Sequence, residues 1–269
     1  MNAAATRVGD VLLEVGADGA LVATIDRERA MNSLGPAVLV GLHEAAARAD
    51  RDGHPVLVVR GSGGTLSTGA DLHHLLPLRE DPEAVRGYVA EIGAVNLAIE
   101  QARAVSVAVV DGYAVAGGCE LMLACDLSVV SERSQIGDRH LEYGLLPGAG
   151  ASVRLPRSLP APLARRLMLT GEMLDGATAH RWGLVTHVAP HTELEGILTQ
   201  LRARLDRHSP TALATMKQMY TEATATPARA ALDRELEIFL GHVRTPDVAE
   251  GLAAFAEGRD PVFPDRNPH

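Results

Sequence analysis

Residues 105–131 read VSVAVVDGYAVAGGCELMLACDLSVVS, and this stretch decides the fold class. An apolar, β-branched run over residues 105–110 ends at Asp111-Gly112, and Gly117-Gly118 then open a second apolar segment. This pattern predicts a strand, a tight turn, a buried helix and another strand. The predicted helix carries one carboxylate, Glu120, among apolar residues.

A carboxylate on a buried helix loses its hydration, which is costly unless the group is paired or serves a reaction that needs a raised pKa. Glu120 is therefore a candidate catalytic residue. The structural alternative is a core carboxylate that has a partner elsewhere in the fold.

The chain has 269 residues, of which 46% are hydrophobic, and a formal net charge of -9 at pH 7. This composition suits one large core, and alternating strand-like and helix-like segments predict an α/β domain. We expect an α/β core over residues 1–191 and a helical region over residues 192–269. The acidic balance argues against a nucleic-acid partner.

Other classes of protein are disfavoured by what the sequence lacks. No apolar run reaches the roughly 18 residues that read as a membrane span, and the first ten residues lack a signal-peptide pattern. We expect a cytoplasmic protein without a membrane partner. Cys119 and Cys125 match neither a zinc nor a redox spacing and are expected to be reduced core thiols. The spacing of the histidines predicts no metal site.

The N-terminal part reads as a hairpin, a helix and a strand. Residues 11–15 and 21–25 alternate around a Gly- and Asp-containing turn, and Ser33 is the expected N-cap of the following helix. After a strand at residues 56–59 comes the segment RGSGGTLSTGAD, residues 60–71. Its glycines permit positive φ and close approach of the backbone to a ligand, although an irregular surface loop has the same composition.

The remaining chain is largely helical. Asp81-Pro82 begins a long predicted helix, and residues 136–150 form an irregular connection that contains His140. Two short helices ending in glycine follow, and amphipathic helices fill the chain beyond residue 192. Those amphipathic helices need a surface to cover, and another copy of the chain is the most economical partner.

Five segments in chain order resemble the crotonase superfamily, the enoyl-CoA hydratases and isomerases. They are LSTGADL (66–72), DGYAVAGGCELMLACDL (111–127), GLLPGAGASVRLPR (144–157), LTGEMLDGATAHRWGLV (169–185) and EGLAAFAEGRDPVF (250–263). The resemblance implies an α/β, crotonase-type spiral of ββα units with a C-terminal helical trimerisation region. It also implies a homotrimer or hexamer, an acyl-CoA substrate, a place in fatty acid metabolism, and no metal or cofactor beyond the coenzyme A of the substrate.

The resemblance assigns the main catalytic positions. Chemistry at the α-carbon of a thioester passes through an enolate, whose oxygen is stabilised best by preorganised backbone N–H donors. Ala70 and Gly117 match the residues that supply these donors, and Gly117 lies at a helix start, where the dipole favours negative charge. Glu120 matches one of the two catalytic glutamates of the hydratases.

His140 stands where the hydratases have their second glutamate. Hydration needs one group to activate water and another to deliver a proton to the α-carbon. With an ordinary pKa near 6.5, a histidine can donate that proton at neutral pH. The alternative is that His140 forms only the wall of the pocket.

The resemblance also implies contacts with coenzyme A. These residues are Arg29, as a charge for phosphate, Ala30 and Met31 through their backbone, Thr68 near the adenine, and Asp71 and Leu72 in the glycine segment. A solvated surface arginine is the alternative for Arg29.

Three functions are compatible with these residues. The first is an enoyl-CoA hydratase or isomerase. The alternative is a C–C bond hydrolase or decarboxylase of a β-keto compound, because some β-diketone hydrolases of the superfamily place a histidine near this point; Ala149, in place of a helper Asp, weakens that reading. The third is a non-catalytic acyl-CoA binder, against which the presence of Glu120 and both oxyanion positions argues.

Overall fold

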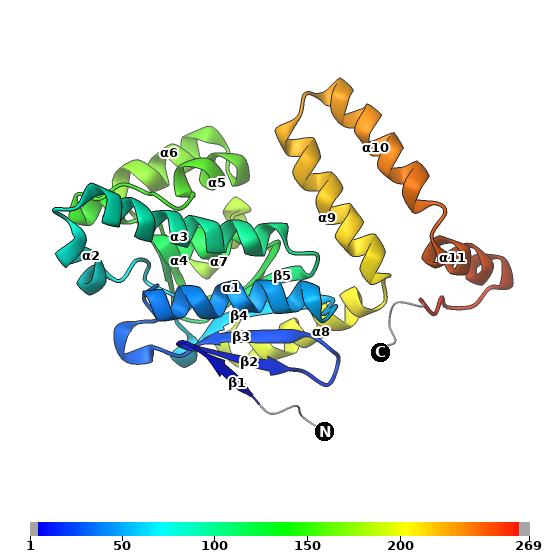
Figure 1. The fold of residues 1–269 in the computed structure, drawn as a ribbon, viewed down its shortest axis with the longest axis horizontal. Coiled ribbons are helices and arrows are strands. Elements are labelled where there is room, and N and C mark those ends of the chain that lie inside the picture. Colours follow the sequence, from blue (N-terminus) through cyan, green and yellow to red (C-terminus); the bar gives the residue numbers. More distant parts are fainter. Residues whose placement is uncertain (1–4, 264–269) are drawn as a thin grey trace.

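The computed structural model describes residues 5–263. Within them, a seven-stranded sheet has the order β1-β2-β3-β4-β5-β7-β10, and a smaller sheet has the order β6-β8-β9 (Figure 1). The strands are β1 Thr6–Val8, β2 Val11–Val15, β3 Leu21–Ile25, β4 Val56–Gly61, β5 Val105–Val110, β6 Tyr113–Val115, β7 Leu127–Ser131, β8 Gln135–Gly137, β9 Leu174–Asp175 and β10 His187–Ala189.

Helices cover both faces of the large sheet. They are α1 Pro36–Arg51, α2 Leu72–Leu78, α3 Pro82–Gln101, α4 Gly117–Ala124, α5 Ala151–Ser158, α6 Ala161–Thr170, α7 Gly176–Trp182, α8 Leu194–Asp206, α9 Pro210–Ala225, α10 Ala228–His242 and α11 Pro246–Glu257. Short 3-10 turns are η1 Glu28–Ala30, η2 Ser62–Gly64, η3 His140–Tyr143 and η4 His191–Glu193.

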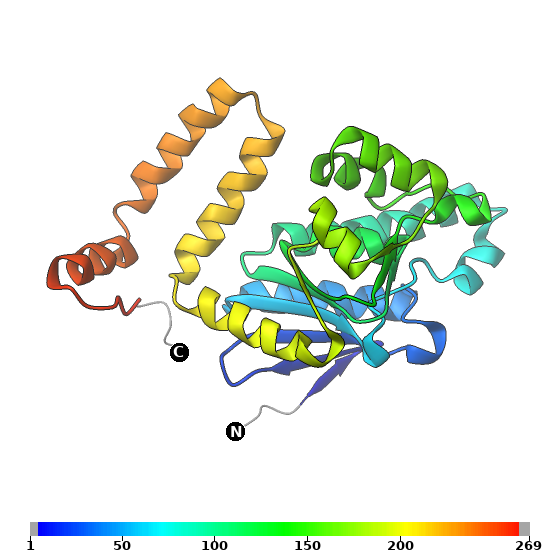
Figure 2. The ribbon, with the colours of Figure 1, turned by 180° about the vertical axis from the view of Figure 1, so that it is seen from behind.

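Alternation along β4 separates two apolar layers, because successive side chains of a strand point to opposite faces. Leu57 and Val59 belong to the larger core, which α1 and α3 cover, whereas Val56 and Val58 belong to a second cluster. Leu198 and neighbouring residues of α8 complete that second cluster, and Figure 2 shows α8 lying across the sheet on the side away from α1.

The central part of the chain winds between the two sheets. β5 of the large sheet leads to β6 of the small sheet and then to α4, and β7 leads in the same way to β8. This is the repeated ββα winding expected from the sequence. It places the ends of β6 and β8 side by side, because these strands pair in parallel with Val115 opposite Gly137.

Several sequence predictions are confirmed. β2 and β3 form the antiparallel hairpin, and the Asp81 carboxylate caps α3 by accepting from Glu83 N (3.0 Å) and Ala84 N (3.1 Å). Gly171 and Gly183 end α6 and α7 in the left-handed conformation. Both cysteines are free thiols.

Other predictions were wrong or incomplete. The N-cap of α1 is Gly35 rather than Ser33, whose hydroxyl instead accepts a hydrogen bond from Arg27. The three-residue strand β6 was missed between the predicted turn and α4 because so short a strand has no readable alternation. α5 was missed because it contains Pro156 and follows a Gly- and Pro-rich segment.

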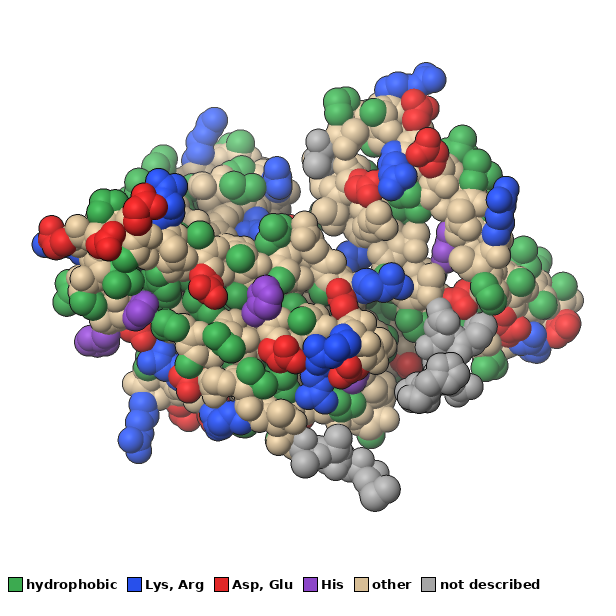
Figure 3. Space-filling model, viewed as in Figure 1, with side chains coloured by type: hydrophobic (Ala, Val, Ile, Leu, Met, Phe, Trp, Pro, Cys, Tyr) green, Lys and Arg blue, Asp and Glu red, His purple; other side chains and the backbone are tan. Residues whose placement is uncertain are grey.

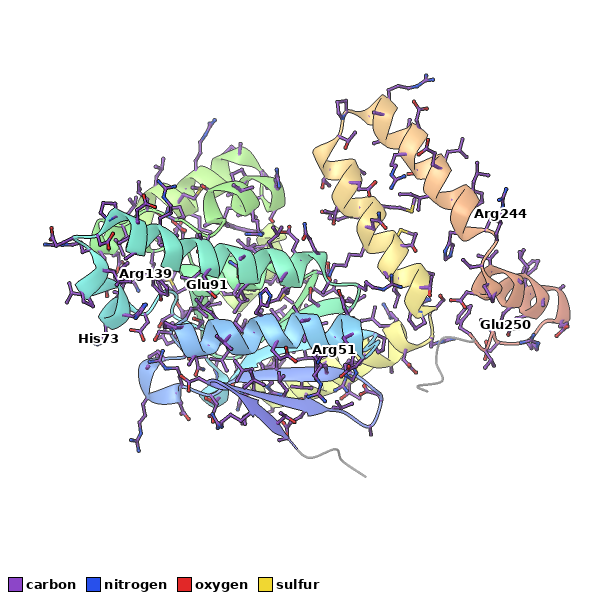
Figure 4. All side chains as sticks on the ribbon, viewed as in Figure 1. Arg51, His73, Glu91, Arg139, Arg244 and Glu250 are labelled. Carbon is purple, nitrogen blue, oxygen red and sulfur yellow. The ribbon has the colours of Figure 1, made fainter. Side chains whose placement is uncertain are left out.

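Helices α9, α10 and α11 stand beside the core rather than on it (Figures 1 and 2). Arg244 and Glu250, labelled in Figure 4, lie in this region. Lys217 of α9 joins it to the core: its ammonium lies 2.7 Å from Asp126 Oδ2 and donates to the carbonyl oxygen of Ala104 at 3.0 Å. α8, which also lies beyond residue 191, packs on the sheet. The domain boundary at residue 191 stays a prediction.

None of the helices in the described part of the chain combines the length and the hydropathy needed to cross a bilayer.

Candidate active site

Two glycine turns meet at the start of α4. A side-chain carbon on Gly69 would lie 2.7 Å from the Gly117 nitrogen, and one on Gly117 would lie 3.3 Å from the Ala70 nitrogen. Gly69 also has φ 96°, in the region that favours glycine. The structure therefore brings together the two amides predicted as oxyanion donors. The first N–H groups of a helix lack acceptors within that helix, which leaves Gly117 N–H available to a ligand.

The backbone conformation of Ala116 sets the direction of the Gly117 N–H group. It precedes α4 with φ 50° and ψ -118°, a conformation that costs a non-glycine residue about 1–3 kcal/mol. The turn is secured on both sides, because Ala116 N donates to Gly137 O (2.9 Å) and Ala116 O accepts from Glu120 N (3.0 Å). Strain retained in this way is typical of positions where the direction of the backbone matters.

Glu120 is buried, with 2% of its surface exposed. Its Oε1 accepts hydrogen bonds from the backbone N–H groups of Ala149 (3.0 Å) and Ala151 (2.9 Å). Among the described residues, Oε2 accepts no hydrogen bond. One oxygen of the carboxylate thus holds the side chain in place, and the other can accept a proton from a water molecule or a substrate.

A second layer of contacts holds the turn that binds Glu120. The carbonyl oxygen of Ala149 accepts from Asn96 Nδ2 (3.1 Å) and from Arg154 Nη1 (3.0 Å). Arg154 in turn donates to Glu100 Oε2 at 2.6 Å. Because α3 and α5 supply these side chains, the packing of two helices sets the position of the Glu120 carboxylate.

His140 is anchored in a similar manner. Its Nδ1 lies 2.9 Å from Asp138 Oδ1, and 12% of the His140 side chain is exposed. Asp138 directly follows β8, as Ala116 directly follows β6. Because β6 and β8 pair in parallel, the segments that contain Glu120 and His140 begin at neighbouring strand ends.

The segment predicted to bind coenzyme A forms one surface with the glycine turn. Met31 O accepts from Thr68 N (3.2 Å) and from Thr68 Oγ1 (3.3 Å). Arg29 and Met31 are exposed and Ala30 is half-buried. Among the described ion pairs Arg29 takes part in none, which leaves its guanidinium for an external anion. Its contact with a phosphate stays a prediction.

Asp71 has partners within the protein. Its carboxylate lies 3.0 Å from Arg27 Nη1 and caps α2 by accepting from His73 N (3.0 Å) and His74 N (3.3 Å). Although burial favours the protonated form, the hydrogen bond from Arg27 and those from the two amides hold the pKa of Asp71 below its usual range. Leu72, the next residue, is 42% exposed and can touch a ligand.

Tyr88 connects this turn to α3. Its hydroxyl donates to Leu34 O (2.7 Å) and accepts from Asp71 N (2.8 Å). His73, labelled in Figure 4, lies on α2 at the outer edge of the molecule.

Two further cations, Lys217 and Arg259, have acidic partners within the protein. Lys217 is paired with Asp126, and Arg259 donates to Glu250 at 2.6 Å and to Glu257 at 2.6 Å. Within residues 5–263, no group of three or more His, Cys, Asp and Glu side chains is arranged to hold a metal ion.

A shallow groove adjoins the site. It is lined by residues of α3 and by the residue before Ala149: Pro82, Val85, Arg86, Val89, Ala90 and Gly148. A side-chain carbon on Gly148 would lie 2.5 Å from Val89 Cγ1, so the glycine allows α3 to approach the turn that binds Glu120.

Sequence reasoning missed the residues that fix the positions of the predicted site residues. Asp138 was not singled out, although its place two residues before His140 was a readable signal. Arg27 and Asn96 are far in sequence from the groups they bind, as Arg154 is from Glu100, and none of the three carried a local signal.

Comparison with known proteins shows the family of the chain. The sequence profile of the family described as "Enoyl-CoA hydratase/isomerase" matches residues 16–266. The 2,3-dehydroadipyl-CoA hydratase of Escherichia coli is 33% identical over 250 residues, which cover 91% of this chain and 95% of that protein. A probable enoyl-CoA hydratase of Mycobacterium bovis is 32% identical and covers 91% of this chain and 94% of its own.

Solved structures give the same result. The enoyl-CoA hydratase of Bacillus anthracis superposes with a TM-score of 0.90 at 28% identity, covering 94% of this chain and 98% of its own. DspI of Pseudomonas aeruginosa superposes with a TM-score of 0.89 at 32% identity, covering 96% and 98%. The fold is therefore the α/β crotonase type expected from the sequence. The chain belongs to the enoyl-CoA hydratase/isomerase family.

Asp71 predicts a pH dependence of stability. Because its folded-state pKa is lowered, Asp71 stabilises the fold above the ordinary carboxyl pKa of about 4, and this contribution is lost as the pH falls through the folded value. Asp71→Asn should therefore be less stable than the parent chain at pH 7, and the difference should narrow toward pH 3. Urea unfolding at pH 7 and at pH 3 measures the difference in the free energy of unfolding between the two chains. An equal difference at both pH values would contradict the lowered pKa of Asp71.

Proposed function

We propose that the chain hydrates an enoyl-CoA thioester and that Glu120 and His140 are its acid-base pair. The buried Glu120 carboxylate, held through Oε1 alone beside two adjoining glycine turns, is the observation that carries the proposal.

The thioester carbonyl is polarised first. Its oxygen accepts hydrogen bonds from Ala70 N–H and Gly117 N–H, which stabilise the negative charge of the enolate as it forms. Gly117 is the first residue of α4, so the positive end of the helix dipole adds to this effect. A missing donor of this kind typically costs about 10²–10³ in turnover.

Water then adds across the double bond. Glu120 Oε2 takes a proton from water as its oxygen bonds to the β-carbon, and the protonated His140 ring gives a proton from Nε2 to the α-carbon. The product is a 3-hydroxyacyl thioester. Proton exchange with solvent returns Glu120 to the carboxylate and His140 to the protonated ring.

The substrate is an acyl-CoA thioester. The exposed Arg29 faces its phosphates, Ala30, Met31 and Thr68 follow the nucleotide, and the groove beside Gly148 receives the acyl chain. The hydratase names of the relatives support this class of substrate. The reaction needs no cofactor beyond the coenzyme A of the substrate, and we propose that it belongs to fatty acid metabolism in the cytoplasm.

Substitutions at the two groups test the reaction. Glu120→Gln keeps an oxygen for the amides of Ala149 and Ala151 but removes the base, so turnover of crotonyl-CoA should fall by about two to four orders of magnitude with KM nearly unchanged. His140→Ala should lower the turnover of crotonyl-CoA by a similar factor. His140→Glu should keep or raise the rate of hydration.

Chromatographic separation of the 3-hydroxyacyl product measures the turnover of every variant on one scale. His43→Ala, an exposed histidine of α1, is the matched control and should retain full activity. Full turnover in His140→Ala would assign the ring to the pocket wall and leave Glu120 as the single base of an isomerase or a cleavage enzyme.

We also propose that the chain assembles as a homotrimer, or as a hexamer of two trimers, through α9 to α11. Large apolar side chains are exposed along these helices, among them Leu236, Phe239, Leu252 and Phe255, the last being 86% exposed. Figure 3 shows apolar side chains over the part of the molecule that contains α10 and α11. Burial of such a surface stabilises an assembly by roughly 25 cal/mol per Å².

Sedimentation velocity tests the assembly. The parent chain should sediment as a trimer or a hexamer at micromolar concentration, whereas Phe239→Glu together with Leu236→Glu should yield smaller species. Arg229→Glu, on the same helix but with its side chain 90% exposed in an ion pair, is the control that should leave the mass unchanged. A stable monomer of the parent chain would contradict the proposal.

A further inference from the structure

We propose that Asp138 is a positioning residue that keeps the proton of His140 on Nδ1, so that the ring exchanges protons with the substrate only through Nε2. The inference rests on the proposed function of His140 and assigns a residue that acts through it. Three features of the structure support it.

The first feature is the burial of Asp138. Only 2% of its side chain is exposed, and the hydrogen bonds among the described residues give its carboxylate one partner, His140 Nδ1. A buried carboxylate is costly to desolvate and is usually satisfied by several donors. The desolvation of a carboxylate with a single partner destabilises the fold locally, and such destabilisation is typical of functional positions.

The second feature is the backbone between the two residues. Arg139 has φ 44° and ψ 7°, the left-handed conformation, which turns the chain so that Asp138 and His140 face each other. This conformation is unfavourable for a non-glycine residue. Asp138 itself follows Gly137, whose carbonyl oxygen accepts from Ala116 N at 2.9 Å, so the pair is tied to the turn of the oxyanion donors.

The third feature is the charge around the pair. Arg139 forms an ion pair with Glu142 on η3, so neither of these side chains competes for the imidazole. On α4, burial and then the nearby carboxylates of Asp138 and Glu120 raise the pKa of Cys119, which therefore stays a neutral thiol. Asp138 is the negative group that contacts the ring.

These features determine how the ring is used. An imidazole nitrogen that donates to a carboxylate keeps its proton, and the tautomer of the neutral ring is set by that bond. Nε2 is then a donor in the protonated ring and an acceptor in the neutral ring. A carboxylate bound to His in this manner fixes the orientation and the tautomer without itself taking the proton.

Enzyme kinetics provide the first test. Asp138→Asn should lower kcat for crotonyl-CoA hydration by about 10²–10⁴ with little change in KM, the range seen when the partner of a catalytic histidine is altered. In a His140→Gln background the same substitution should cost almost nothing, because residues that act through one another are not additive. Glu132→Gln, an exposed carboxylate on the turn before β8, is the control and should leave kcat unchanged.

A purely structural role predicts a different result. Asp138→Asn would then lower activity by the same factor in both backgrounds, and that outcome would overturn the proposal. Full activity of Asp138→Asn, in a parent enzyme that loses activity on His140→Ala, would also overturn it while leaving the proposed function in place.

Nitrogen NMR of the histidine rings gives a readout independent of turnover. The resonances of His140 are identified by their loss in His140→Gln, and the spectrum is recorded at a pH where the ring is neutral. The parent chain should show a protonated Nδ1 and a bare Nε2, and Asp138→Ala should lose this preference. A bare Nδ1 in the parent chain would refute the role of Asp138, whether or not the chain hydrates crotonyl-CoA.

Discussion

The buried carboxylate of Glu120 is the constraint on which the site depends. Without partners it would destabilise the core, and two amides from the Ala149–Ala151 turn satisfy it through a single oxygen. That turn is held by Asn96 and Arg154, so α3, α4 and α5 must pack together before the carboxylate is satisfied. The stability of the fold and the geometry of the candidate site therefore depend on the same contacts.

The two proposed acid-base groups are held in the same way. Glu120 and His140 are each bound through one atom to the protein, which leaves the other atom of each group for chemistry. The ββα winding makes this possible, because the parallel strands β6 and β8 end next to each other and each leads directly into one of the two segments. The oxyanion turn at Ala116 is bonded to the same strand end.

Sequence alone predicted the parts of the site that lie in contiguous segments. Ala70 lies in a Gly-rich run whose composition indicates a turn, and Gly117 and Glu120 lie in an apolar run that indicates a buried helix. The structure brings these two segments together. The contacts Arg27–Asp71, Arg154–Glu100 and Lys217–Asp126 could not be predicted, since each joins residues far apart in the chain. The Asp138–His140 pair depends on the left-handed backbone conformation of Arg139, which the sequence does not indicate.

A crystal structure with acetoacetyl-CoA, whose enolate resembles the intermediate, tests the central claim most directly. The account predicts that the thioester oxygen lies about 2.7–3.1 Å from both Ala70 N and Gly117 N, with the acyl carbons between Glu120 Oε2 and His140 Nε2. A thioester oxygen bound away from these amides, or acyl carbons out of reach of either side chain, would contradict it.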